Sequence, residues 1–233
     1  NEAQGKLSLQ DQHFLFFSPF NNSKRGKVKS MDPHADFILA EALIQAGLLQ
    51  EIRGDRLREK APDGAVLITC GDRDRFKAHF TGCNGFVNVH PICLNGGGVL
   101  LGTDVDVVRQ RIIVEDCVEA FAVKGLSFIL SLAHFPCGKC AKLGISFQDI
   151  VLKTLEGKAH LKKHIPRDSL TGVLPLVSID WRSAHIKQEH GVKLYALRLQ
   201  DAKAIAGFRQ TNGRYVALRP HRSNHVGGMA LFT

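Results

Sequence analysis

The sequence predicts an α/β domain with a mainly parallel central sheet and flanking helices. Two apolar runs, at 65–70 and 127–133, are continuous rather than alternating, which is typical of strands buried on both faces of a parallel sheet. A stretch with helical spacing of apolar residues, at 104–124, lies between them. Strand, helix and strand therefore predict a βαβ unit with a right-handed crossover. A chain of 233 residues fits one domain of this class.

Caps, turn residues and apolar spacing predict the remaining elements. The helix at 104–124 is expected to bury Val105, Val108, Ile112, Cys117, Val118 and Phe121 and to end at Gly125. The other expected elements are a helix at 32–50, a strand at 86–89 followed by a packed loop at 90–93, a helix at 146–158, strands at 173–179 and 192–199, a short helix at 184–190, and a hairpin around Asn212-Gly213. The loop Asn95-Gly96-Gly97-Gly98 lets its backbone approach a ligand or another chain closely.

The domain organisation follows from composition along the chain. We expect an N-terminal arm at 1–31 and a single domain at 32–233, with a core at 32–165 and a basic C-terminal extension at 166–233. The formal net charge is +9, and the whole excess of basic residues lies in the last third of the chain. Such a surface attracts anions. Nucleic acid is not an expected partner, because no arginine-rich motif or RNA-reading aromatic pattern accompanies the charge.

Cysteine content and hydropathy indicate the compartment. The chain has 6 cysteines, too few for a secreted disulfide framework in a chain large enough to build its own core. Reduced thiols in a cytoplasmic protein are the better interpretation. No apolar run reaches the roughly 18–20 residues of a membrane-spanning helix, so no membrane partner is expected.

Both predicted buried strands end in side chains that bind metals. Cys70 ends the first strand, His134 ends the second, and Cys137 follows at the start of the next helix. Sites in open parallel sheets lie beyond the carboxyl ends of the strands, so the three converge if the strands are neighbours. Two thiolates and an imidazole suit Zn²⁺. The fourth position is expected to hold water, as in a catalytic site, or a carboxylate such as Asp72.

These motifs resemble those of the β-class carbonic anhydrases. The family pattern is Cys-x-Asp-x-Arg after a strand and then His-x-x-Cys-Gly, which Cys70-Gly71-Asp72 and His134-Phe135-Pro136-Cys137-Gly138 match in part. The segment 85–89 is similar to the family's second strand. The resemblance covers about residues 32–155, and the final third of the chain is only loosely similar.

The resemblance implies a fold, a metal and a reaction. It implies a β-carbonic-anhydrase-like domain with zinc on Cys70, His134 and Cys137, and it implies that Asp72 orients or replaces the fourth ligand. The implied activity is that of a zinc lyase: reversible hydration of carbon dioxide to bicarbonate by zinc-bound hydroxide. The implied assembly is a homodimer or a higher homo-oligomer.

The chain departs from the family pattern at two points near the metal ligands. The family's arginine falls on Asp74, and Arg73 and Arg75 flank it. We therefore expect Asp72, Arg73 and Arg75 to form the catalytic group, with weakened activity because the Asp–Arg pair is altered. Cys140 lies one helical turn after Cys137, which allows a closed site of three cysteines and one histidine.

Two alternative functions stay open from the sequence. The closed site favours a zinc-binding relative without the activity, acting as a regulatory or binding module. A zinc hydrolase for another small electrophile, such as carbonyl sulfide, would use the same ligands. Only substrate assays separate this hydrolase from a carbonic anhydrase.

Overall fold

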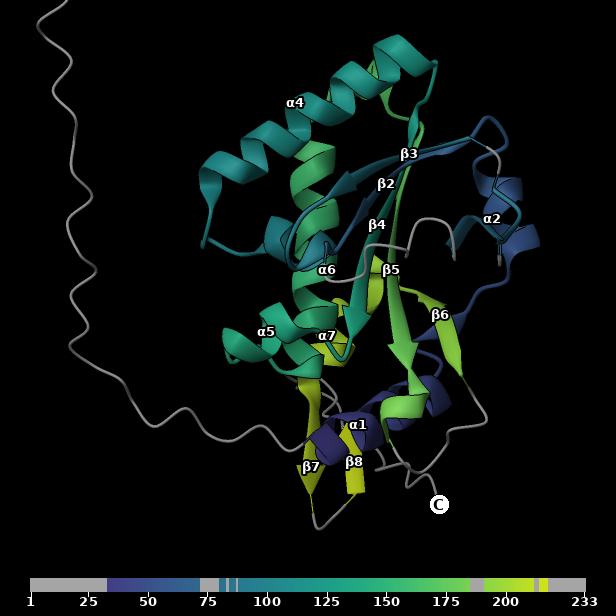
Figure 1. The fold of residues 1–233 in the computed structure, drawn as a ribbon. Helices are drawn as coiled ribbons and strands as arrows, with labels where there is room; N and C mark the ends of the chain where they lie inside the picture. The colour runs from purple at the N-terminus through teal and green to yellow at the C-terminus, as the bar shows by residue number, and fades with distance from the viewer. Residues whose placement is uncertain are drawn as a thin grey trace, which may run out of the picture. The chain divides into compact units, whose positions relative to one another are not determined.

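The computed structural model describes residues 33–71, 80–82, 84–86, 88–184, 191–211 and 214–217 (Figure 1). The expected N-terminal arm at 1–31 and the last sixteen residues, 218–233, lie outside the described residues. The helices are α1 (Pro33–Gln45), α2 (Gly54–Lys60), α4 (Val107–Lys124), α5 (Gly138–Lys142), α6 (Phe147–His164) and α7 (Ala202–Gly207), with 3₁₀ turns η1 (Gly97–Gly102), η2 (Arg167–Ser169), η3 (Trp181–Ala184) and η5 (Leu199–Asp201). The strands are β1 (Gln50–Glu51), β2 (Ala65–Thr69), β3 (Val89–Cys93), β4 (Phe128–Phe135), β5 (Gly172–Asp180), β6 (Val192–Ala196), β7 (Phe208–Thr211) and β8 (Arg214–Ala217).

A six-stranded sheet in the order β1-β6-β5-β4-β2-β3 forms the centre of the domain. Strands β3, β2, β4 and β5 are parallel, whereas β6 pairs antiparallel with β5 and β1 antiparallel with β6. The two strands that carry the proposed ligands, β2 and β4, are direct neighbours, with Leu67 opposite Leu130. The expected α/β class, the mainly parallel sheet and the βαβ unit are therefore confirmed.

Helices cover both faces of this sheet, which explains the continuous apolar runs. On one face, Val66 and Ile68 of β2 pack with residues of α4 and α6 such as Cys117. On the other face, Leu67 packs with Leu57 of α2. Figure 1 shows α4 and α6 on one side of the sheet and α2 on the other. All five residues of β2 are buried, as the absence of polar alternation in this strand predicts.

Helix α4 begins and ends as its capping residues predict, but its buried face differs from the expected one. The Asp106 side chain accepts a hydrogen bond from the Arg109 backbone N–H at 3.0 Å, and Gly125 ends the helix in a left-handed conformation. Expected core residues Val105, Val108 and Ile112 are exposed, whereas the buried residues of the helix are Gln110, Ile113, Cys117, Ala120 and Phe121. Apolar residues surround the first half of this helix, so helical spacing alone did not identify the buried face.

The second parallel strand lies three residues later than expected. The sequence suggested a strand at 86–89 with a packed loop after it, but β3 spans Val89–Cys93 and pairs with β2 along its length. Pro91 lies inside this strand opposite Leu67. Proline is tolerated there because β3 is at the edge of the sheet, where one side of the backbone needs no partner.

The C-terminal extension contains the expected hairpin. Strands β7 and β8 pair antiparallel, with Phe208 opposite Ala217. Of the short helix expected at 184–190, the structure describes only Ala184, which is the last residue of the 3₁₀ turn η3. The other residues, 185–190, lie outside the described residues. In the part of the chain that the structure covers, every helix is too short or too polar to cross a bilayer.

Two adjacent isoleucines of α4 test which face of the helix is buried. Ile113 is 3% exposed and Ile112 is 45% exposed. Ile113→Ala should lower the free energy of unfolding by about 2–5 kcal/mol, because it leaves a cavity in the core. Ile112→Ala should change it by less than about 1 kcal/mol. Urea unfolding of both variants measures the difference, and a larger loss for Ile112→Ala would show that the face expected from the sequence is the buried one.

Candidate metal centre

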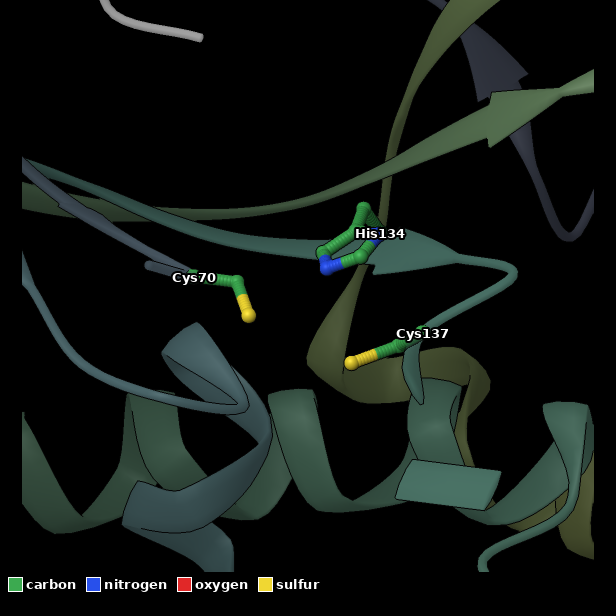
Figure 2. Close-up of side chains that lie close together, drawn as sticks. All are labelled: Cys70, His134 and Cys137. Carbon is green, nitrogen blue, oxygen red and sulfur yellow. The ribbon is translucent and has the colours of Figure 1, made fainter. Parts of the chain in front are cut away.

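Three side chains that bind metals converge at the carboxyl end of the parallel strands. The ligand atoms of Cys70, His134 and Cys137 all lie within 4.8 Å of one another and are buried. Figure 2 shows both sulfur atoms and a nitrogen of the His134 ring facing a common space. The expected ligand set is therefore brought together.

Each ligand comes from a different element. Cys70 follows the last residue of β2, His134 is the penultimate residue of β4, and Cys137 is the N-cap of α5. The parallel register places Ile68 opposite Ser131, so Cys70 reaches the level of the end of β4. The Cys137 carbonyl accepts a hydrogen bond from Ala141 N–H at 2.9 Å, which fixes this cysteine at the start of the helix.

The glycine-rich loop after β3 holds one of the ligands. The Gly96 backbone N–H donates a hydrogen bond to Cys70 Sγ at 3.1 Å. A hydrogen bond to sulfur stabilises the thiolate form that binds metals, and it orients the ligand. The adjacent Gly97 has φ +54°, and a Cβ there would lie 2.5 Å from Leu132 O and 2.9 Å from Cys70 N. The sequence predicted a close backbone approach by this loop, and the structure shows that the loop approaches the two strand ends.

Cys140 is close to one ligand but is not part of the three-residue group. It is 1% exposed and lies in α5. Hydrogen bonding with the Cys140 thiol is the largest cause that raises the pKa of Cys137, to about 11, and Cys70 acts in the opposite direction. Among the described residues, the set with all ligand atoms within 4.8 Å consists of Cys70, His134 and Cys137.

The expected catalytic residues Asp72, Arg73 and Arg75, together with Asp74, lie outside the described residues. The structure therefore does not place the altered Asp–Arg pair. A different pair, which the sequence analysis missed, lies at the end of β5. Arg182 donates to both carboxylate oxygens of Asp180, each at 2.8 Å, and Asp180 is 7% exposed. Its signal in the sequence is an Asp and an Arg two residues apart after a buried strand, which is too common to stand out.

The donor set fits a zinc ion. Zinc–sulfur bonds are about 2.3 Å and zinc–nitrogen bonds about 2.0 Å, so donors of a tetrahedral site are about 3.5–4 Å apart. Small side-chain rotations bring donors within 4.8 Å to that spacing. Two thiolates and one imidazole match the preference of zinc and of other thiophilic ions.

Comparisons with protein-family models, curated proteins and solved structures found no match to this chain.

The close contact of the loop at 95–98 with the strand ends should control how much metal the chain holds. Gly97→Ala should reduce the metal content severalfold, because its Cβ would displace the backbone at Cys70 and Leu132. Gly47→Ala is the matched control, since Gly47 also has positive φ (+70°) but nothing within 4 Å of the added Cβ. Elemental analysis of both purified variants measures the effect, and equal metal loss in the two variants would show that the loop contact is not responsible.

Proposed function

We propose that this chain binds one zinc ion through Cys70, His134 and Cys137 and acts as a carbonic-anhydrase-like lyase that reversibly hydrates carbon dioxide. The observation that carries the proposal is the convergence of these three buried donors within 4.8 Å at the carboxyl ends of neighbouring parallel strands. The motifs that resemble the β-class carbonic anhydrases support the same reaction.

The presence of three donors among the described residues favours catalysis over a purely structural role. Structural zinc sites usually have four protein ligands, whereas catalytic sites have three and keep one position open. When bound, zinc supplies a hydroxide nucleophile near neutral pH. The proposed substrate is small, neutral and apolar, so it needs little polar recognition beyond the nucleophile.

The surroundings of the ligands suit such a substrate. Cys70 and Cys137 belong to an apolar cluster that includes Val99, Phe135 and Phe147. This packing excludes bulk water from the sulfur side of the site and strengthens the electrostatic interactions within it. The Gly96 N–H holds the Cys70 sulfur in position on the same side. In the proposal, Asp72 orients the nucleophile, and Arg73 and Arg75 hold Asp72 less well than the arginine that the family has at position 74, which weakens the activity.

A closed, non-catalytic zinc site is the second candidate. It is favoured by the buried Cys140 thiol, which interacts with Cys137 closely enough to raise its pKa. A rotation of the Cys140 side chain could add a fourth donor, which would leave no open position. In that case the chain would be a binding or regulatory module.

Zinc content separates the three-donor and four-donor sites. We expect about one zinc per chain, and Cys70→Ser or His134→Ala should remove most of it because each change deletes a ligand. Cys140→Ser should retain it. Cys93→Ser is the control, because Cys93 is an exposed thiol on the edge strand β3. Loss of zinc from Cys140→Ser would favour the closed site, and full zinc in Cys70→Ser would contradict the ligand assignment.

Stopped-flow hydration of carbon dioxide tests the reaction. The zinc-loaded protein should accelerate hydration at pH 7 to 9, and Asp74→Arg should raise the rate about tenfold or more by restoring a bidentate partner for Asp72. Asp104→Arg, in the exposed loop before α4, controls for the change in charge. A fully zinc-loaded protein that hydrates neither carbon dioxide nor carbonyl sulfide would support the binding module instead. Hydrolysis of carbonyl sulfide alone would identify the hydrolase.

A further inference from the structure

A polar pocket lies on the α2 face of the sheet, beside the strand that carries His134. Its volume is about 450 Å³, within the range of about 300–1,000 Å³ that is typical of small-molecule sites. The described residues that line it come from the segment after β1, from α2, from positions 80 and 84, and from the facing ends of β5 and β6. The pocket is thus built from parts of the chain that are far apart in sequence.

The sheet register places this pocket one strand away from the metal ligand. Ser178 lines the pocket and lies directly opposite His134 in the pairing of β4 with β5. On its other side Ser178 lies opposite Leu194, which also lines the pocket. Residues opposite each other in a sheet point to the same face, and neighbouring strands are about 4.8 Å apart. The floor of the pocket is therefore adjacent to His134.

Among the described lining residues, ion pairs account for every charged side chain except Arg58. Lys193 Nζ and Glu51 Oε2 are 3.0 Å apart, and Arg53 Nε and Asp55 Oδ1 are 3.7 Å apart, so these two pairs cancel. Arg58 has no carboxylate partner in the part of the chain that the structure describes. The lining residues therefore carry one net positive charge.

The Arg58 side chain is nevertheless held in place. Its Nη1 donates a hydrogen bond to the Asn84 carbonyl, which ties α2 to the segment at position 84 that also lines the pocket. A fixed guanidinium keeps further N–H donors in a planar fork that matches a carboxylate. A side chain held in this way loses little conformational entropy when it binds an anion.

Apolar side chains lie in the same pocket as the guanidinium. Ile52 and Leu194 are half-buried and line the pocket, whereas Phe80, also in the lining, is 2% exposed and adds almost no open surface. A simple inorganic anion would leave these surfaces without a partner, whereas an organic anion would cover them. The lining therefore combines one anion-binding group with an apolar wall.

We propose that this pocket binds a small organic monoanion whose carboxylate pairs with Arg58 and whose apolar part packs against Ile52 and Leu194. The binding requires neither a metal at the neighbouring site nor the proposed hydration reaction. The ligand would lie over Ser178, next to the strand that holds His134.

Phenylacetate and its neutral analogue phenylacetamide test the proposal on the unmodified full chain. The two probes have nearly the same shape, so isothermal titration calorimetry should show saturable binding of phenylacetate and at least about tenfold weaker binding of phenylacetamide, because only the carboxylate forms charge-assisted hydrogen bonds. Equal binding of the two probes, or no saturable binding of phenylacetate, would overturn the proposal.

A pair of arginine variants locates the site. Arg58→Gln should weaken phenylacetate binding about tenfold or more. Arg56→Gln should not, because Arg56 lies on the same helix, pairs with Glu59 at 2.9 Å and does not line the pocket. Equal weakening by both variants would mean that the general charge of α2 attracts the anion, and the assignment to Arg58 would be wrong. If Arg58→Gln does not fold, amide chemical shifts of the wild type decide: the shifts caused by phenylacetate should include Ser178, Leu194 and Asn84, and shifts confined to other parts of the chain would overturn the proposal.

Discussion

The close approach of the loop after β3 to the sheet is the contact on which both the core and the metal centre depend. Gly97 lies against the backbone of Cys70 and Leu132, where a side chain has no room. The 3₁₀ turn that begins there packs in turn against α6, where a Cβ on Gly157 would lie 2.8 Å from Gly98 O. The same set of contacts therefore joins β2, β4 and α6, and it places the Gly96 N–H on the Cys70 sulfur.

The metal centre lies where side chains from both faces of the sheet meet. By strand alternation Cys70 belongs with Ile68, on the face covered by α4 and α6, whereas His134 belongs with Leu132, on the α2 face. A site in the middle of the sheet could not combine them, because the strands themselves would separate the two side chains. Beyond the strand ends this barrier is absent, which is the physical reason why parallel sheets carry their sites there.

Much of the fold and the ligand set could be predicted because these features depend on local patterns. The continuous apolar runs before Cys70 and His134 indicated buried parallel strands, and both strands were found as neighbours. The position of β3 was missed because the run at 86–89 indicated the strand, whereas the strand continues through Pro91, which only its edge location makes tolerable. The pocket at Arg58 could not be predicted, because tertiary packing assembles it from α2, β5 and β6. No local sequence pattern shows which of its charged side chains form ion pairs with one another.

Metal binding at this centre would also contribute to the stability of the domain. The three donors come from the end of β2, the end of β4 and the start of α5, so a bound ion links elements that are separated in sequence. In an unfolded chain Cys70 is far from the other two donors, and the ion would bind the folded state preferentially. The binding free energy then adds to the free energy of unfolding. The Gly96 hydrogen bond and the buried cluster around Cys137 hold the sulfur atoms near each other before the ion arrives, which reduces the ordering that binding requires. The packing of the core would thus also set how tightly a metal ion is held.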